Sequence, residues 1–357
     1  MKTVAKFEIG FEQYLDPEGK PTKKLPRTAN KEELLKLYRL MTLVRIFDTK
    51  AIALQRTGKL GTYASSLGHE AAHAAIGVAM KEKDCLAPMY REYAAQIERG
   101  VKMSEILLYW GGDERGSNFS GPAHDFPWCV PIATQYLHAA GAAAAFKYRK
   151  EERVAVTVIG DGGTSEGDFY EAINAAGAWQ LPFVGVVVNN KWAISVPLEK
   201  QTAAETLAQK GVAAGIECVQ VDGNDIVAMR EVMEKALAKA RAGKGPTLIE
   251  ALTYRLHDHT TADDASRYRS DEEVKAHESK EPLIRLRKYL MEQGWWTEED
   301  EEKLIEECRA EVDEAVSEYQ NIEPPGVEDM FDYHFEEITE PLAEQREVAI
   351  REARRNG

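Results

Sequence analysis

The fold is decided by residues 154–190, which read VAVTVIGDGGTSEGDFYEAINAAGAWQLPFVGVVVNN. This stretch holds two β-branched apolar runs, VAVTVIG at 154–160 and FVGVVVN at 183–189, with a helical segment between them. Weaker apolar runs follow at 216–221 and 246–252. Continuous apolar strands that alternate with helices are typical of a parallel sheet whose two faces are both covered by helices. The sequence therefore predicts a three-layer α/β fold with a parallel sheet.

Each of the two strong strands is followed by polar residues. The first ends in a Gly-Asp-Gly turn at 160–162, the second ends in an Asn-Asn pair at 189–190, and 26 residues separate the two motifs. That length is enough for one crossover helix, and parallel strands joined in this way bring their carboxyl ends together. The carboxylate of Asp161 and an amide oxygen would then lie side by side, and such hard oxygen ligands suit Mg²⁺. The glycines permit a tight turn against a diphosphate, and the helix after Thr164 adds N–H groups for the anion.

Other interpretations of the Gly-Asp-Gly motif compete with this one. Taken alone, such a turn is common in α/β proteins and has a structural role in many of them. A nicotinamide-binding fingerprint needs GxGxxG, but residues 160–165 read GDGGTS, with Ser165 in place of the last glycine. A Walker phosphate loop needs GxxxxGK followed by Ser or Thr, and the sequence contains no such run. The two motifs together therefore favour a site for a metal and a diphosphate.

The N-terminal part of the chain predicts an arm followed by two helices. Residues 1–30 are polar and contain several prolines, so we expect an irregular N-terminal arm. Apolar residues at helical spacing predict a long helix from Lys31 to Gly58, and EAAHAAIGVAMKE at 70–82 predicts a second helix. A loop rich in Gly, Ser and Pro follows at 111–131, and loops of that length inside a domain are often functional.

The central and C-terminal parts are predominantly helical between the strands. Helical patterns cover 168–179, 202–215 and 225–243, and the chain beyond residue 280 is helical and acidic. We therefore expect one α/β domain over residues 31–325, with a helical C-terminal region and a C-terminal tail at 326–357.

The composition excludes several classes of protein. The chain has 357 residues, of which 44% are hydrophobic and 29% charged, as in a soluble globular protein, and its formal net charge is −15. That acidity argues against nucleic acid or an anionic membrane as a partner, because like charges repel. The N-terminus lacks the apolar core of a signal peptide, and no apolar run approaches the roughly 20 residues that span a bilayer. The cysteines are scattered and form no CxxC pair, so we expect a cytoplasmic protein without a disulfide framework or a structural zinc site. These cysteines are Cys85, Cys129, Cys218 and Cys308.

The Gly-Asp-Gly and Asn-Asn motifs resemble those of the thiamine-diphosphate-binding enzymes. Their surroundings at 158–197 are similar to the α subunits of the heterotetrameric pyruvate and branched-chain 2-oxo acid dehydrogenases. The resemblance includes PMYREYAAQIERG at 88–100 and PTLIEALTYRLHDHTTADDASRYRS at 246–270, and it covers roughly residues 30–320. It implies a thiamine-diphosphate-binding fold and the oxidative decarboxylation of a 2-oxo acid, with pyruvate as the expected substrate.

The resemblance also implies which residues form the site. Mg²⁺ would be held by the side chains of Asp161 and Asn190 and by the carbonyl oxygen of Trp192. Contacts to thiamine diphosphate are implied for Tyr90, Arg91, Ile132, Gly162, Gly163 and Arg255. The arginines suit this role because a guanidinium can meet phosphate oxygens with two parallel hydrogen bonds. Arg255 and Mg²⁺ would anchor the diphosphate, and Ile132 would support the bent cofactor.

A histidine pair follows the predicted strand at 246–252. His257 and His259 have acidic neighbours, but zinc needs three or four convergent ligands and none lies nearby in the sequence. The resemblance implies that His259 is the catalytic histidine, acting at the end of the site away from the diphosphate, and we expect His257 to order the loop. Some family members carry a further active-site histidine in the long loop, where this chain offers only Asn118 or His124.

The activating acid is expected on another chain. Thiamine activation needs a carboxylate on the aminopyrimidine ring, which the family supplies from a second domain, and Glu70 begins an amphipathic helix instead. The resemblance therefore implies an α₂β₂ assembly in which a β subunit supplies the glutamate, and a lipoyl acyltransferase component that accepts the acyl group. Three alternatives stay open: a branched-chain 2-oxo acid dehydrogenase subunit, an acetoin-cleaving relative, and a metal-dependent phosphate-binding protein without thiamine chemistry.

Overall fold

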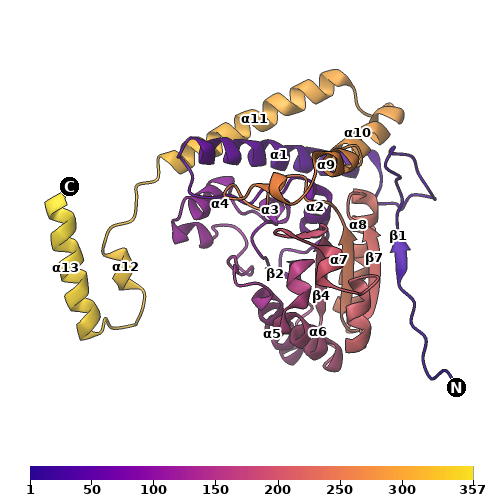
Figure 1. Ribbon diagram of the computed structural model, residues 1–357, viewed down its shortest axis with the longest axis horizontal. Helices are drawn as coiled ribbons and strands as arrows, with labels where there is room; N and C mark the ends of the chain where they lie inside the picture. The colour runs from indigo at the N-terminus through magenta and orange to yellow at the C-terminus, as the bar shows by residue number, and fades with distance from the viewer. Residues whose placement is uncertain (357) are drawn as a thin grey trace. The chain divides into compact units, whose positions relative to one another are not determined.

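The computed structural model describes residues 1–356 and divides into two compact units, Met1–Val316 and Ser317–Gly357. The larger unit is built on a six-stranded sheet of order β1-β7-β8-β4-β3-β2, in which every neighbouring pair is parallel (Figure 1). Its strands are β1 (Gly10–Glu12), β2 (Cys85–Ala87), β3 (Ala155–Gly160), β4 (Phe183–Asn189), β7 (Glu217–Asp222) and β8 (Thr247–Leu252). A separate antiparallel pair is formed by β5 (Trp192–Ala193) and β6 (Val196–Pro197).

Helices cover both faces of this sheet, which confirms the predicted α/β architecture. On one face α5 and α6 pack on β3 and β4, and the hydroxyl of Tyr136 on α5 donates to the carbonyl of Val186 on β4 at 3.0 Å. On the other face α8 packs on β4, β7 and β8, and α2 packs on α8. The helices of the sheet layers are α1 (Lys31–Arg56), α2 (Glu70–Ala79), α5 (Thr134–Arg149), α6 (Gly167–Ala178) and α8 (Ile226–Arg241). The others in this unit are α3 (Tyr93–Glu98), α4 (Met103–Trp110), α7 (Leu198–Gln201), α9 (Asp271–Glu278), α10 (Pro282–Glu292) and α11 (Glu298–Gln320), of which α11 runs across the boundary between the units.

The pairing of β3 with β4 sets the position of the two polar motifs. Ala155 lies opposite Phe183 and Gly160 lies opposite Val188, so the two strands end at the same edge of the sheet. The strands are buried along almost their whole length, as their unbroken apolar sequence requires. The turn after β3 and the asparagines after β4 therefore meet, as the crossover rule predicts.

The N-terminal arm differs from the irregular segment that the sequence predicts. Gly10–Glu12 form the edge strand β1 and pair in parallel with β7. Asp225, which caps α8, also accepts from the backbone N–H groups of Tyr14 and Leu15 at 2.6 and 2.8 Å. A three-residue strand that depends on pairing with a strand more than 200 positions away has no local pattern that sequence periodicity could reveal.

The prediction of a helix at 202–215 is wrong. Only a 3-10 segment, η3 (Ala208–Ala214), forms there, and it packs against β7 and β8. Gly211 approaches β7 so closely that a Cβ atom would lie 2.6 Å from the sulfur of Cys218. The carboxylate of Glu250 on β8 accepts from the N–H of Ala208 at 3.0 Å. These contacts outweigh the local helical pattern. The long loop at 111–131 contains one 3-10 turn, η1 (Glu114–Ser117).

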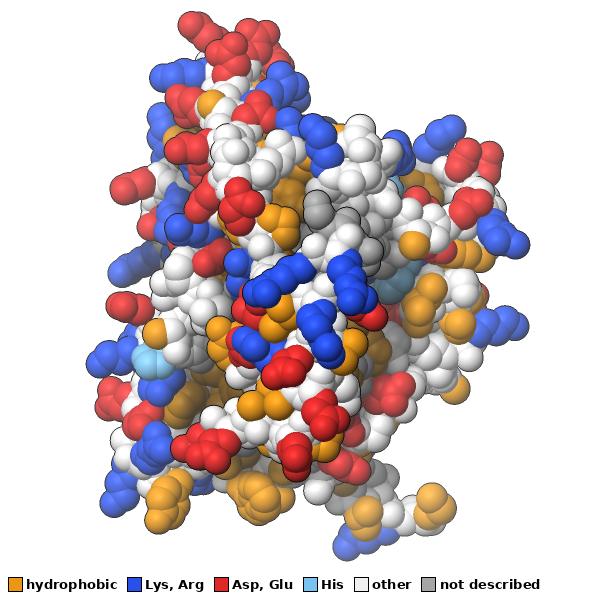
Figure 2. Space-filling model, turned by 90° about the vertical axis from the view of Figure 1, so that its left-hand side faces the viewer, with side chains coloured by type: hydrophobic (Ala, Val, Ile, Leu, Met, Phe, Trp, Pro, Cys, Tyr) orange, Lys and Arg blue, Asp and Glu red, His pale blue; other side chains and the backbone are white. Residues whose placement is uncertain are grey.

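The smaller unit contains α12 (Asp329–Asp332) and α13 (Glu340–Asn356), joined by an ion pair between Arg346 and Asp332 at 2.8 Å. Among the described residues of the chain, no helix combines the length and the apolar character needed to cross a membrane. Acidic and basic side chains are interspersed over the face of the molecule in Figure 2, with hydrophobic side chains in small groups among them.

Candidate active site

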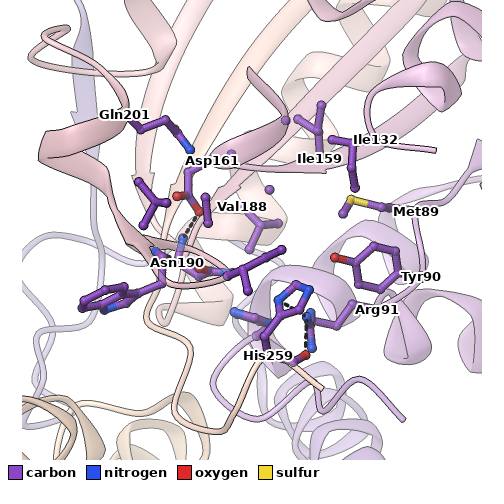
Figure 3. A pocket seen from close by; sticks show the side chains of 18 of the residues that line it. Met89, Tyr90, Arg91, Ile132, Ile159, Asp161, Val188, Asn190, Gln201 and His259 are labelled. Atoms are coloured by element: carbon purple, nitrogen blue, oxygen red, sulfur yellow. Dashed lines mark hydrogen bonds between the residues drawn. The ribbon is translucent and has the colours of Figure 1, made fainter. Parts of the chain in front are cut away.

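A cavity of about 310 Å³ lies at the carboxyl ends of β3 and β4 (Figure 3). Its walls come from the turn after β3, the segment after β4, the Met89–Glu92 segment, the start of α2 and the loop that carries His259. It is lined by almost all of the predicted site residues, namely Tyr90, Arg91, Ile132, Asp161, Gly162, Gly163, Asn190, Trp192 and His259. The fold thus brings together in one cavity residues that are widely separated in the sequence.

The carboxylate of Asp161 is the most unusual group in this cavity. The side chain is 1% exposed, and its Oδ1 atom accepts from the backbone N–H of Asn190 at 3.3 Å. Its Oδ2 atom has no hydrogen-bond partner within the described part of the chain. Burial raises the pKa of Asp161 to about 6, because the charged form loses its hydration. An unpaired buried carboxylate oxygen is costly unless another group, such as a cation, supplies the missing partner.

The neighbouring oxygens complete a set that a hard cation could use. The side-chain oxygen of Asn190 accepts from the N–H of Trp192 at 3.1 Å, and the carbonyl of Trp192 accepts from Arg255 at 3.3 Å. Residues 1–356 contain no cluster of three or more His, Cys, Asp and Glu side chains that could hold a metal. A metal here would therefore have a mixed set of carboxylate, amide and carbonyl oxygens. That donor chemistry fits Mg²⁺ better than zinc.

Two glycines of the turn after β3 are required by close packing. A Cβ atom on Gly162 would lie 2.7 Å from the Cβ of Ala193, and one on Gly163 would lie 2.5 Å from a side-chain carbon of Ile159. With its amide oriented to satisfy both groups, Gln201 donates to the carbonyl of Asp161 at 2.9 Å and accepts from the N–H of Gly162 at 3.2 Å. Gly162, to which the resemblance assigns a backbone contact with the cofactor, thus already has its N–H engaged.

Arg91 and His259 form a second polar group on the cavity wall (Figure 3). One Arg91 nitrogen donates to the carbonyl of Ser65, and the other donates to the carbonyl of His259 at 3.0 Å and lies 3.5 Å from its Nδ1 atom. Burial, together with the positive charges of Arg91 and Arg255, lowers the pKa of His259 to about 3. The imidazole is therefore neutral near pH 7. Its contact with Arg91 places His259 beside a residue that is predicted to hold the diphosphate.

Arg255, which is predicted to contact the diphosphate, is not among the residues that line the cavity. It is fully buried behind the cavity wall, and its guanidinium donates to the carbonyls of Trp192 and Ile194 at 3.3 and 2.8 Å and to the hydroxyl of Tyr268 at 2.7 Å. These contacts fix the backbone after β4, including the carbonyl predicted to bind the metal. In this structure Arg255 orders the site from behind and does not line the cavity.

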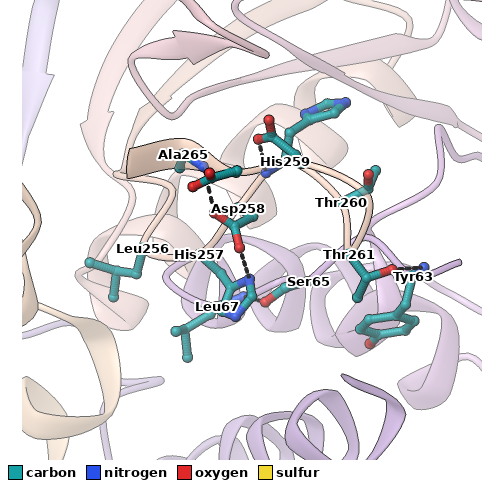
Figure 4. Close-up of polar contacts among 12 residues, drawn as sticks. Tyr63, Ser65, Leu67, Leu256, His257, Asp258, His259, Thr260, Thr261 and Ala265 are labelled. Carbon is teal, nitrogen blue, oxygen red and sulfur yellow. Dashed lines mark hydrogen bonds and ion pairs between the residues drawn. The ribbon is translucent and has the colours of Figure 1, made fainter. Parts of the chain in front are cut away.

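The loop that carries His259 is docked on the segment before α2 (Figure 4). The backbone N–H of Tyr63 donates to the hydroxyl of Thr261 at 3.0 Å, and the N–H of Thr261 donates back to the carbonyl of Tyr63 at 2.8 Å. His257 and His259 point to opposite sides of this loop, and His257 lies 3.8 Å from the carboxylate of Asp258. Only His259 of the two lines the cavity.

Two histidines that the sequence analysis did not select also line the cavity. They are His69 and His73, at the start of α2, and both are buried. The sequence around them predicts an apolar helix that packs in the core, so nothing in it marks the two histidines as site residues. Neither Asn118 nor His124, the candidates from the long loop, is part of the wall. Glu70 lies between His69 and His73 in the sequence. It accepts from the N–H of Gly68 at 2.9 Å and is paired with Arg45, which makes it a structural carboxylate.

Known proteins are similar to this chain over most of its length. Residues 38–328 match the family described as "Dehydrogenase E1 component". The chain is 43% identical over 338 residues to the pyruvate dehydrogenase E1 component subunit alpha of Acholeplasma laidlawii, covering 93% of this chain and 97% of the relative. The protein of the same description from Staphylococcus aureus is 41% identical over 348 residues, covering 97% of this chain and 94% of the relative. The match spans every strand of the sheet except β1, all residues that line the cavity and every predicted site residue, and the chain belongs to the dehydrogenase E1 component family.

Proposed function

We propose that this chain is the α subunit of the decarboxylating component of a pyruvate dehydrogenase complex. It would catalyse the oxidative decarboxylation of pyruvate with thiamine diphosphate, and the acetyl group would pass to a lipoyl group on the acyltransferase component. The observation that carries the proposal is the buried, unpaired carboxylate oxygen of Asp161, placed beside Asn190 where β3 and β4 end. Relatives named as pyruvate dehydrogenase subunits over almost the whole chain support the choice of substrate.

Mg²⁺ is the proposed metal, held by Asp161, Asn190 and the carbonyl of Trp192. Asp161 would supply the charge that a divalent cation needs, and its pKa near 6 leaves it ionised at neutral pH. Arg255 holds the Trp192 carbonyl in place through its hydrogen bond. Phosphate oxygens of the cofactor and water would supply the remaining ligands.

Thiamine diphosphate, when bound, supplies the electron sink for loss of CO₂ from the 2-oxo acid. The side chains of this subunit would bind and orient the cofactor and would exclude water from the cavity. Arg91 is held by the carbonyls of Ser65 and His259, and its cationic guanidinium lines the cavity where an anionic group would lie. His259 is neutral and can donate or accept one hydrogen bond with each ring nitrogen. Ile132, Ile159 and Val188 supply apolar surface to the cavity wall.

A β subunit is proposed to supply the activating glutamate. The carboxylates of Glu70 and Glu92 near the cavity are engaged, since Glu70 pairs with Arg45 and Glu92 accepts from the N–H groups of Met89 and Arg91 at 2.9 and 3.2 Å. Apolar side chains lie exposed at the cavity, since Ile132 is 40%, Ile194 is 54% and Val196 is 43% exposed. Exposed apolar groups at the rim of a site are suited to burial by a partner subunit. We propose an α₂β₂ assembly in the cytoplasm.

Substrate preference tests this proposal. The chain and its β subunit, supplied with thiamine diphosphate and Mg²⁺, would be assayed by dye reduction with pyruvate and with 3-methyl-2-oxobutanoate in parallel. We expect a higher kcat/KM for pyruvate. A higher kcat/KM for the branched acid would assign the chain to a branched-chain 2-oxo acid dehydrogenase, and no activity with either acid would contradict the proposal.

A further inference from the structure

His69 and His73 form a buried pair in the wall of the cavity. His69 is the N-cap residue of α2, and His73 follows one turn later on the same side of the helix, with ring centroids 5.6 Å apart. The two side chains are 0% and 1% exposed, and both line the cavity that contains Asp161, Arg91 and His259.

These rings lack the hydrogen bonds that buried polar groups normally make. Both ring nitrogens of His69 and the Nδ1 atom of His73 have no partner among the described residues. A neutral imidazole has one donor and one acceptor nitrogen, and leaving such groups buried and unpaired is unfavourable. Native structures retain an unpaired buried group where a bound molecule or an ion supplies the partner. Both residues belong to the wall of the cavity, which is where a bound molecule could supply the missing partner.

The charges around the pair indicate what kind of atom that partner is. The positive charges of Arg91 and Arg255 both act on His69, and Arg91 also acts on His73. The other titratable groups in the cavity wall are Tyr90, Glu92, Asp161, Glu166 and His259. Glu92 is occupied by two backbone N–H groups, and Asp161 belongs to the proposed metal site. A ring N–H close to two guanidinium groups is best matched by an anionic oxygen.

We propose that His69 and His73 are ligand-binding residues that donate ring N–H hydrogen bonds to the anionic oxygens of a diphosphate bound beside Arg91. The cavity itself points to an anionic oxygen, and the assignment of that oxygen to a diphosphate rests on the proposed function. His69 is the stronger donor position, because neither of its nitrogens has another partner. His73 extends the same wall by one helical turn.

The test is the affinity of the chain, reconstituted with its β subunit, for two probes measured by titration calorimetry in the presence of Mg²⁺. The probes are thiamine diphosphate and inorganic pyrophosphate, which shares only the diphosphate. His69→Leu keeps the side-chain volume without a donor, whereas His69→Gln keeps an N–H donor. His73→Leu and His73→Gln form the second pair, and His334→Leu, on an exposed residue outside the cavity, is the control.

We expect His69→Leu to raise the Kd of both probes on the order of ten- to a hundredfold, since a hydrogen bond to a charged group is lost. His69→Gln should recover most of that affinity, and a residue with a purely structural role would not show this rescue. The His73 variants should follow the same order with a smaller change, while His334→Leu should bind as the wild type does.

The possible outcomes separate this inference from the proposed function. Equal affinities for the wild type and both leucine variants would overturn the histidine inference and leave the proposed function standing. If the wild type binds pyrophosphate but not thiamine diphosphate, and His69→Leu weakens pyrophosphate binding, the proposed function fails and the histidine inference stands. Failure of the wild type to bind either probe would overturn both.

Discussion

Two buried aspartates of the larger unit differ in how completely they are hydrogen-bonded. Asp48, on α1, accepts from the hydroxyl of Ser65 and the N–H of Ser66, both at 2.6 Å, and from the hydroxyls of Tyr63 and Ser66 at 3.1 and 3.2 Å. Asp161, after β3, accepts one hydrogen bond of 3.3 Å and leaves its other oxygen unpaired. The two carboxylates are almost equally buried, at 2% and 1% exposed.

The difference separates a carboxylate that builds the site from one that we propose acts in it. Asp48 fixes the segment at 63–66, and the carbonyl of Ser65 in that segment accepts from Arg91. Asp161 is buried with one of its two oxygens unpaired, as expected for a group whose hydrogen bonding a ligand completes. The first region should therefore respond to mutation through stability, and the second through ligand binding.

Replacement of Asp161 should have the largest effect. Asp161→Asn removes the only carboxylate of the proposed metal site, so binding of thiamine diphosphate with Mg²⁺ should weaken by more than about a hundredfold. The fold should persist, because the carboxylate makes a single long hydrogen bond to the protein. Titration calorimetry and thermal unfolding of the same preparation would check both points. Unchanged affinity would remove the distinction between the two aspartates.

Replacement of Asp48 should act in the opposite way. Asp48→Ala leaves the donors of Tyr63, Ser65 and Ser66 buried without an acceptor, and the free energy of unfolding should fall by about 3 kcal/mol. Cofactor affinity should fall less than in Asp161→Asn, since Arg91 itself is retained. Denaturant unfolding would measure this. Asp313→Ala, at an aspartate with a 62% exposed side chain, is the control and should change stability by less than about 0.5 kcal/mol.

Much of this comparison could be predicted from the sequence, and the reasons are local. The strands β3 and β4 are unbroken apolar runs, and the crossover rule then places Asp161 next to Asn190. The family resemblance located Arg91 and His259, and both line the cavity.

What could not be predicted depends on contacts between distant segments. His69 and His73 sit in an apolar helical pattern and become cavity residues only because α2 starts beside Arg91. The direction of the Arg255 guanidinium is set by the carbonyls of Trp192 and Ile194, far from it in sequence. The strand β1 depends on pairing with β7, more than 200 residues later.

His73 should make the free energy of unfolding of the chain depend on pH. Burial and Arg91 lower the pKa of His73 to about 3, below the ordinary histidine value of 6.5. In the unfolded chain, His73 therefore becomes protonated below about pH 6.5, whereas in the folded chain it stays neutral until about pH 3. This group should thus lower stability as the pH falls, by about 1.4 kcal/mol per pH unit. In His73→Gln the free energy of unfolding should fall less steeply between pH 6 and pH 4.5. Parallel curves from urea unfolding would show that His73 is protonated in the folded chain.

Gln201 should give the smallest effect. Gln201→Ala removes the amide that hydrogen-bonds to the carbonyl of Asp161 and to the N–H of Gly162, so this N–H becomes free. The lost positioning and the newly available donor oppose each other, so the affinity for thiamine diphosphate should change by less than about fivefold. Calorimetry would measure this change, and a loss as large as that of Asp161→Asn would show that the turn depends on Gln201.

The most direct test of the central claim is pyruvate-dependent dye reduction by the chain alone, by the β subunit alone and by both together. Each mixture would contain thiamine diphosphate and Mg²⁺, with the cofactor, the metal or Asp161 removed in turn. We predict activity only in the complete mixture of both subunits, and its loss in Asp161→Ala. Activity of the chain alone, or full activity of the reconstituted Asp161→Ala protein, would contradict the account.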